Sequence, residues 1–176
     1  MQRGCAPVLC VLAVLGLQSA VQEECTIVRA LRGKLAYQQR LQYTRHYFPI
    51  NYTVNVHFHE VLRAANVSSL RARNASEPAL RYLWLQVNSQ VLRKIGEVLL
   101  EEHPSWEYTR DLRRLLEQLE EEYESYNQGN VDPAVWEIVE EVLAADAGSS
   151  RKAVRPKALL DNCARVMWLL YSQLCH

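Results

Sequence analysis

Four segments of this 176-residue chain place apolar residues at helical spacing, and the connections between them limit how they can pack. The segments cover about residues 26–48, 77–103, 105–126 and 156–174. The second runs almost directly into the third, whereas roughly thirty residues follow the first segment and about thirty precede the fourth. A simple up-down bundle has three short loops, but one short link between two long crossovers fits an up-up-down-down four-helix bundle. We therefore predict an all-α fold with this topology.

Proline and capping residues set the predicted helix ends. Thr26 is a candidate N-cap of the first helix, and Pro49 ends that helix because proline disfavours the α-conformation of the residue before it. Ser76 opens the second helix, and Pro104 separates it from the third. An extra short helix is expected from Pro133, with valines on one face.

The first crossover contains a predicted β-strand. Residues 50–58 alternate apolar and polar side chains, which is the period of a strand with one buried face. A lone strand is not stable, so it needs a partner. Residues 61–67 and residues near Val154 are both candidates. The segment 147–154 otherwise has the Gly, Ser and basic composition of a loop.

The first twenty residues have the features of a secretory signal peptide. A positively charged start is followed by the apolar run Ala6–Leu17, which is too short to span a bilayer. Small residues follow, so cleavage after Gly16 or Ala20 fits the pattern. We predict a signal peptide at 1–20 and one helical domain at 21–176, secreted and without membrane insertion.

Three N-glycosylation sequons support export. They begin at Asn51, Asn66 and Asn74, all within 26 residues. Such sequons are modified only on exposed backbone, so we expect this segment to lie at the surface and to carry glycans.

The charges are balanced overall but separated along the chain. Twenty basic and twenty acidic side chains give no global attraction to nucleic acid, which is therefore not an expected partner. Basic residues on the first helix and before the last one are candidates for proteoglycan contact: Arg29, Arg32, Lys34, Arg40, Arg45, Arg151, Lys152, Arg155 and Lys157. Acidic residues gather at Glu97, Glu101, Glu102 and 117–124.

One acidic pair is a candidate binding surface. Glu97 and Glu101 are four residues apart, so we predict that they share a helix face. Trp106, just past Pro104, is expected beside that face. Carboxylates next to an aromatic ring are typical of a hot spot for a basic protein partner. The alternative is an exposed glutamate pair and a core tryptophan.

Three cysteines follow the predicted signal peptide: Cys25, Cys163 and Cys175. An oxidising compartment favours disulfides. We favour Cys25–Cys163, which fastens the first helix to the last, and Cys175 is the alternative partner of Cys25. Helical rise separates Cys163 from Cys175 by about 18 Å, so the two pairings are not interchangeable. In the favoured pairing Cys175 is the odd thiol.

The sequence has no clear catalytic or metal-binding motif. G-x-S-x-G, H-E-x-x-H, C-x-x-C and phosphate-binding glycine loops do not occur. The strongest candidate is His57 and His59 on one strand face, followed by Glu60, but a metal site needs further ligands. A solvated strand face is the preferred interpretation. We expect no enzyme, no metal and no cofactor.

Several long motifs resemble the interleukin-34 family, in particular a member from a non-mammalian vertebrate. The resemblance covers about residues 24–172. The motifs that carry it are Glu24-Cys25-Thr26, Leu41-Gln42-Tyr43, His46-Tyr47-Phe48-Pro49-Ile50-Asn51-Tyr52, Ala65-Asn66-Val67-Ser68, Leu80-Arg81-Tyr82-Leu83-Trp84, His103-Pro104-Ser105-Trp106 and Val154-Arg155-Pro156-Lys157-Ala158-Leu159-Leu160-Asp161-Asn162-Cys163.

The resemblance implies a secreted short-chain helical cytokine that forms a non-covalent homodimer. It also implies binding to the macrophage colony-stimulating factor receptor, a receptor tyrosine kinase with immunoglobulin-like ectodomains. A two-fold dimer can bring two receptors together, so signalling arises from kinase proximity. The implied outcome is survival, proliferation and differentiation of monocytes and macrophages.

The resemblance also implies site residues. The family's bridge between the first and last helices maps onto Cys25 and Cys163, and its sequon maps onto Asn66. Its receptor contacts map onto four positions: Lys34, Glu97, Glu101 and Trp106.

A secreted helical carrier of an apolar small molecule is the alternative function. It requires more apolar side chains than the core buries, lining a cavity.

Overall fold

The computed structural model describes residues 6–47, 52–126, 128–144 and 151–176, with residues 6–18 and 45 described by their backbone alone. These residues are mostly helical and include one two-stranded sheet. In chain order the elements are α1 (Ala6–Lys34), α2 (Tyr37–Leu41), the π-helical turn η1 (Gln42–His46), β1 (Val54–His57), the 3₁₀ turn η2 (Phe58–Glu60), α3 (Ala64–Ala72), α4 (Glu77–Glu97), α5 (Trp106–Glu121), α6 (Pro133–Leu143), β2 (Arg151–Val154) and α7 (Pro156–Tyr171).

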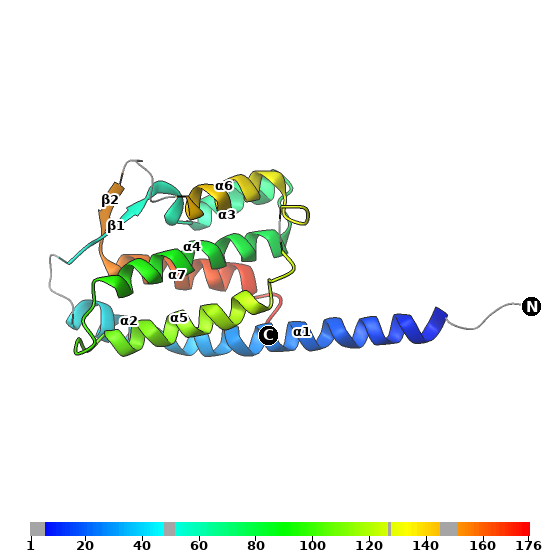
Figure 1. The fold of residues 1–176 in the computed structure, drawn as a ribbon, viewed down its shortest axis with the longest axis horizontal. Coiled ribbons are helices and arrows are strands. Elements are labelled where there is room, and N and C mark those ends of the chain that lie inside the picture. Colours follow the sequence, from blue (N-terminus) through cyan, green and yellow to red (C-terminus); the bar gives the residue numbers. More distant parts are fainter. Residues whose placement is uncertain (1–5, 48–51, 127, 145–150) are drawn as a thin grey trace, which may run out of the picture.

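The helices α1, α4, α5 and α7 form the bundle, and their directions are up, up, down and down (Figure 1). The beginning of α5 lies beside the end of α1, where the Tyr108 hydroxyl donates to the Lys34 carbonyl at 2.8 Å. Farther along α5, Glu120 accepts a hydrogen bond from Ser89 of α4 at 2.6 Å. The predicted all-α topology with long crossovers is confirmed.

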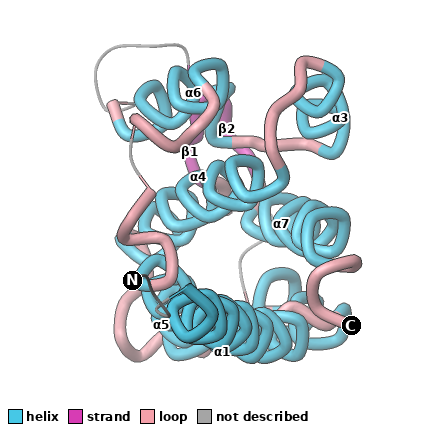
Figure 2. Tube along the Cα trace, turned by 90° about the vertical axis from the view of Figure 1, so that its right-hand side faces the viewer, coloured by secondary structure: helices cyan, strands magenta, loops and turns pink. Residues whose placement is uncertain are grey.

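The molecule has three layers when viewed along the bundle (Figure 2). The α1–α5 pair forms one layer, α4 and α7 form the middle layer, and α3, α6 and the β-ribbon cover the far side. The middle layer carries the centre of the core. Trp84 is fully buried there, stacks edge-on against Tyr171 at 5.8 Å, and donates its indole N–H to the Cys163 carbonyl at 3.1 Å. This contact joins α4 to α7.

Helix α1 differs from the prediction at both ends. Thr26 is not its N-cap, because α1 begins at Ala6 and the Thr26 hydroxyl donates back to the Gln22 carbonyl at 2.8 Å. The helix also stops at Lys34 instead of continuing toward Pro49, since Ala36 is extended with ψ of 146°. Across the described residues, no helix combines the length and the apolar character that crossing a membrane requires.

The two crossovers meet in the small β-ribbon. Strand β1 pairs antiparallel with β2, and Val54 lies opposite Val154. The predicted partner near Val154 is therefore correct, whereas 61–67 is not a strand, because α3 begins at Ala64. The loop predicted at 147–154 is partly wrong, because residues 151–154 form β2. Residues 147–150 lie outside the described part of the chain.

The residue that fastens the ribbon to the bundle is Glu60. Its carboxylate accepts the His57 backbone N–H at 2.6 Å and pairs with Lys94 of α4 at 2.7 Å. The predicted shared face of His57 and His59 is wrong, because β1 ends at His57 and the chain turns there. His57 is buried, whereas the exposed His59 pairs with Glu141 of α6 at 2.9 Å.

An ion pair at the start of α4 makes stability depend on pH. Arg71 holds Glu77 through two bonds of 2.5 and 2.8 Å, and the hydrogen bond from Arg71 lowers the pKa of Glu77. A lowered pKa means that this stabilisation is present above the usual glutamate pKa and disappears as the pH falls through the lowered value. We expect Glu77→Gln to lower the Tm by about 1–3 °C at pH 7, as for a largely exposed pair.

The difference between Glu77→Gln and the parent should become smaller as the pH falls from 7 to 3. Thermal unfolding at both pH values measures it, with the exposed Glu124→Gln as the matched control. A Tm gap of equal size at pH 7 and pH 3 contradicts the assignment.

Candidate functional site

The α4–α5 corner contains three of the four predicted contact residues. Helix α4 ends at Glu97, and Glu101 lies in the following turn, where the His103 N–H donates to the Leu100 carbonyl at 2.9 Å. The prediction that Glu97 and Glu101 share a helix face is therefore wrong. The helix stops seven residues before Pro104, and Val98 follows it as the C-cap with ψ of 0°. Both residues are nevertheless exposed at this one corner, where Glu97 also pairs with Arg93 of α4 at 2.6 Å.

The same corner exposes apolar side chains that the sequence analysis did not assign to a site. Val98 is 58% exposed and Leu100 is 74% exposed. We call these two residues the corner patch. Tyr47, directly after η1, is also partly exposed. The Ser105 hydroxyl connects η1 to the corner by donating to the Tyr43 carbonyl at 2.5 Å. The sequence contained one indication of this patch: Val98 and Leu100 lie shortly before the turn that contains Pro104.

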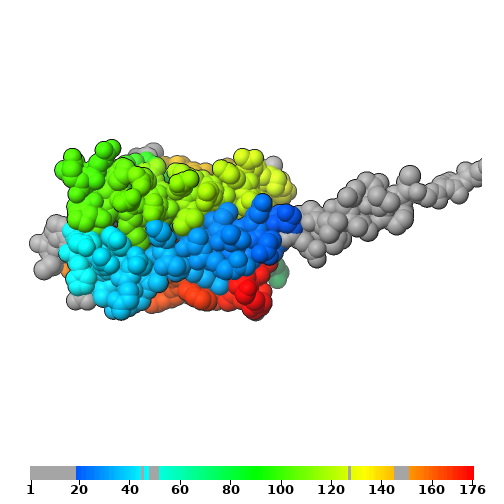
Figure 3. All heavy atoms as spheres, turned by 90° about the horizontal axis from the view of Figure 1, so that it is seen from below, coloured from blue at the N-terminus to red at the C-terminus, as the bar shows by residue number. Residues whose placement is uncertain are grey.

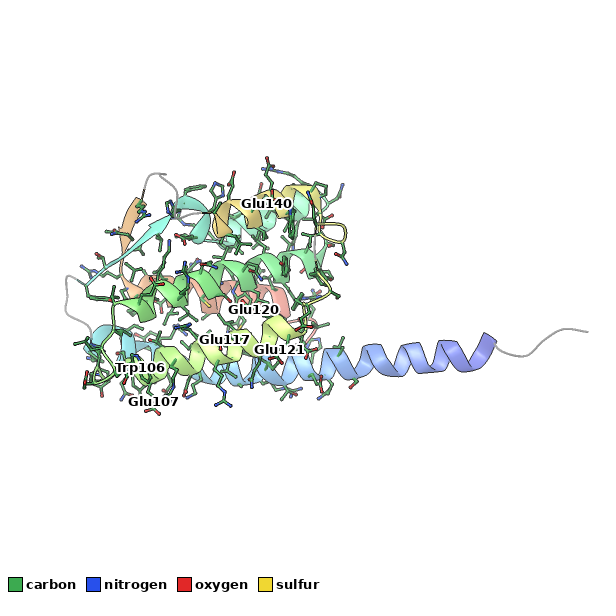
Figure 4. All side chains as sticks on the ribbon, in the orientation of Figure 1. Trp106, Glu107, Glu117, Glu120, Glu121 and Glu140 are labelled. Atoms are coloured by element: carbon green, nitrogen blue, oxygen red, sulfur yellow. A yellow bond between two sulfur atoms is a disulfide. The ribbon has the colours of Figure 1, made fainter. Side chains whose placement is uncertain are left out.

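Trp106 is the first residue of α5 and is half-buried (Figure 4). The guanidinium of Arg110 lies 4.9 Å from the ring centroid, and Glu107 accepts from Arg110 at 3.2 Å. Trp106 is thus neither buried in the core nor fully exposed. The cation–π contact favours this orientation of the ring, part of which remains accessible.

Lys34 lies apart from the other three candidates. Its ammonium pairs with Asp111 of α5 at 2.6 Å, on the side where α5 faces α1. On the opposite flank, Gly96 of α4 packs beside Thr109 and Arg113 of α5. The first turns of α5 therefore separate Lys34 from Glu97. The structure brings Glu97, Glu101 and Trp106 to one corner, and Lys34 belongs to a neighbouring surface.

A groove of about 640 Å³ runs between α1 and α5 next to Lys34. Figure 3 shows α1 between α5 and α7 on this face. Charged and amide side chains contribute much of the lining, namely Lys34, Gln39, Asp111, Arg114 and Gln118. Ala30, Gly33 and Leu115 complete the lining, so this open groove has a mixed polar and apolar character.

The disulfide joins Cys25 to Cys175, and the predicted Cys25–Cys163 pairing is wrong. The Cα atoms of Cys25 and Cys175 are 5.2 Å apart. Cys163 is the free thiol instead, and it is buried. Burial raises the pKa of the Cys163 thiol to about 12, so it remains protonated at neutral pH. The observed bridge joins α1 to the segment directly after α7, whereas the predicted bridge joined α1 to α7 itself.

The antiparallel packing of α1 and α7 explains this pairing. Cys175 lies beside Cys25 at one end, and Arg40 contacts Asp161 at 2.8 Å at the other end. Cys163 lies in the middle of α7, eight residues before its end at Tyr171, which is about 12 Å along the helix. Cys163 is therefore too far from the Cys25 end of the pair for a disulfide.

A comparison with known protein families matches residues 18–176 to the family of interleukin 34. This chain belongs to the interleukin 34 family. The resemblance identified from the sequence motifs is thus confirmed. The match includes α1 from residue 18 onward, the other three bundle helices, the corner and both bridged cysteines. The interleukin 34 family is a family of secreted cytokines and not of enzymes.

Two of the predicted sequons of this interleukin 34 family member lie in the described part of the chain. Asn66 is the third residue of α3, and its side-chain oxygen accepts the Arg63 N–H at 2.9 Å. Asn74 follows α3, is exposed and has φ of 64°. Asn51 lies outside the described residues. Occupancy of the three sequons stays a prediction.

The two basic segments of this interleukin 34 family member meet at one carboxylate. Arg40 of α2 and Lys157 of α7 both donate to Asp161. Burial raises the pKa of Asp161, but the hydrogen bonds from Lys157 and Arg40 outweigh it, so the pKa is lowered. Arg151 and Lys152 lie exposed on β2, directly before α7. Proteoglycan contact through these segments stays a prediction.

The acidic run of this chain lies at the far end of α5 from the corner. Figure 4 shows Glu117 and Glu121 toward the end of α5, whereas Trp106 is at its beginning. Burial raises the pKa of Glu122, and the carboxylates of Glu23, Glu24 and Glu121 add to the effect. This run is therefore a surface separate from the corner.

Proposed function

We propose that this chain is a secreted, homodimeric cytokine that binds and dimerises the macrophage colony-stimulating factor receptor. The outcome is survival, proliferation and differentiation of monocytes and macrophages. Membership of the interleukin 34 family supports the proposal, because the family consists of secreted cytokines. The ligand itself does no chemistry in this function: it brings two receptor kinases together.

We propose that residues 1–20 are a signal peptide that is removed on export. Two observations support this. The family match starts only at residue 18, after the apolar run. In addition, the first turns of α1 extend beyond the bundle, away from the other helices (Figure 1). Cleavage near Ala20 leaves the bridged Cys25 and the rest of the bundle intact.

The corner patch is the observation that supports the proposed homodimer. Val98 and Leu100 are exposed at a sharp turn, where a second copy can reach them without obstruction from the bundle. A two-fold axis through this corner pairs each patch with the same patch of the other copy. Interfaces have an apolar centre and a polar rim, and Glu97 and Glu101 provide charged positions for such a rim.

We propose that Glu97, Glu101 and Trp106 contact the receptor next to the dimer contact. The two carboxylates are exposed, and the tryptophan is held in place by Arg110. This arrangement suits a basic receptor surface, because carboxylates attract cations and a fixed aromatic ring adds contact area at low entropic cost. Lys34 is proposed as a contact on the flanking α1–α5 surface.

Reversing the charges at the corner tests the receptor contact. We expect Glu97→Lys and Glu101→Lys together to weaken binding of the monomeric receptor ectodomain by about tenfold, because attraction to basic groups becomes repulsion. Surface plasmon resonance at physiological salt measures the affinity. Glu140→Lys, an exposed acid on α6 in the outer layer, is the matched control and should bind like the parent (Figure 4).

Light scattering of each charge variant shows whether the dimer persists. Equal receptor affinities of the double variant and the Glu140→Lys control, with intact dimers, would remove Glu97 and Glu101 from the contact surface.

A further inference from the structure

A second groove, of about 390 Å³, lies on the opposite side of the molecule between α3 and α6. This volume is within the usual range of ligand-binding clefts. Its lining includes one face of each helix and the adjoining 3₁₀ turn η2. Aromatic, polar and apolar side chains all contribute, among them Phe58, Asn66, Ser69, Arg73, Glu137 and Ile138.

Tethers at both ends hold the two walls of this groove in place. At one end Asp132, before α6, accepts hydrogen bonds from the backbone and hydroxyl of Ser76, both at 2.9 Å. At the other end His59 pairs with Glu141 of α6 at 2.9 Å. The helices therefore run antiparallel. The wall from Asn66 to Arg73 is about 10 Å long at helical rise.

Phe58 stands at the His59 end of the groove. It is 76% exposed, which makes it the most exposed large apolar side chain among the described residues. Its ring contacts His59 edge-on at 5.2 Å. An exposed aromatic ring on the wall of an open groove offers apolar surface that a bound group can cover.

Asn66 is itself part of the groove wall and is oriented for modification. The group that meets the Arg63 N–H at 2.9 Å must be an acceptor, so it is the side-chain oxygen. The amide nitrogen therefore points away from the start of α3. That nitrogen is the atom to which an N-linked glycan is attached.

We propose that the α3–α6 groove holds the first sugars of a glycan on Asn66, with an N-acetylglucosamine ring against Phe58. The apolar face of a sugar ring packs on an aromatic ring, and its hydroxyl and acetamide groups hydrogen-bond to polar walls. Ser69, Arg73 and Glu137 supply such walls, and Arg73 is already turned toward Ser69, to which it donates at 3.4 Å. The glycan is covalently attached to Asn66, which is a residue of the groove wall.

The other described sequon does not offer this arrangement. Asn74 is exposed and is not part of the groove lining. The inference rests on the proposed secretion, because only an exported chain acquires the glycan, but it concerns a surface away from the receptor corner.

The test is a double-mutant cycle in the full chain produced by secreting mammalian cells. Ser68→Ala removes the sequon but keeps the hydrogen bond from the Arg63 N–H to Asn66, and Phe58→Ala removes the ring. Phe58→Ala should lower the Tm by about 2–4 °C when the glycan is present, as expected for loss of one ring contact, and by much less in the Ser68→Ala background. Phe58→Tyr, which keeps the ring, should restore the Tm.

A second readout follows the glycan directly. Enzymatic release of the Asn66 glycan from the native protein should be about threefold faster in Phe58→Ala, because the ring no longer holds the first sugar. Asn74→Gly is the matched control: it deletes a sequon at a residue with positive φ, which glycine tolerates. Its effect on the Tm should simply add to that of Phe58→Ala.

Two results would overturn the inference. One is glycopeptide mass spectrometry that finds Asn66 unmodified. The other is an equal effect of Phe58→Ala with and without the glycan, together with unchanged release rates. Continued secretion and receptor binding in either case would show that the proposed function stands while the groove assignment fails.

Discussion

Cys25→Ser and Cys175→Ser should each lower the Tm by about 10 °C under non-reducing conditions. The bridge spans 150 residues of sequence, and removing a native disulfide from a small secreted domain costs about 2–5 kcal/mol. Both sulfur-bearing residues are buried, and Arg32 donates to the Cys175 carbonyl at 3.0 Å, so the bridge also organises the chain after α7. Differential scanning calorimetry measures the effect.

The third cysteine supplies the control. Cys163→Ala removes one buried sulfur atom without breaking the bridge, so we expect a loss of only about 3 °C. The double variant of Cys25 and Cys175 should be no less stable than the single variants, because both remove the same bond. A large loss in Cys163→Ala with little effect of Cys175→Ser would restore the pairing that the sequence first favoured.

The disulfide illustrates which features the sequence could predict. Helix starts at Glu77, Pro133 and Pro156 were predicted because prolines and capping residues act on their own neighbours. The topology followed from the number of residues between the predicted helices, which can be read directly from the sequence. The partner of Cys25 depends on how α1 is aligned along α7, and no residue near either cysteine encodes that alignment.

The candidate site was predicted in part for the same reason. The sequence placed Glu97, Glu101 and Trp106 near one corner, because Pro104 had to interrupt the helices there. It did not predict where α4 ends, since the apolar period continues through Val98 and Gly96 lies inside the helix instead of just past its end. The exposed corner patch follows from that earlier end, so it could be recognised only in the structure.

Leu100→Arg should convert the dimer to a monomer and reduce receptor activation by at least about a hundredfold. A charge buried at the centre of a two-fold interface faces its own copy, so repulsion and desolvation act together on both sides of the axis. Losing bivalency then removes an avidity gain on the order of a hundredfold or more. Light scattering measures the mass, and receptor phosphorylation in macrophages measures the activity.

Leu143→Arg is the matched control for this experiment. Leu143 lies at the end of α6 and is 51% exposed, so it receives the same substitution in the outer layer, away from the corner. This variant should remain a dimer with parental activity, and both variants should keep the parental circular dichroism. Binding of the monomeric receptor ectodomain should weaken by no more than about tenfold in Leu100→Arg, because the new cation lies beside Glu101 but one ligand copy still presents Glu97 and Trp106. A Leu100→Arg protein that stays dimeric and fully active would exclude the corner as the dimer contact, and the two-fold axis would then have to pass through another exposed face.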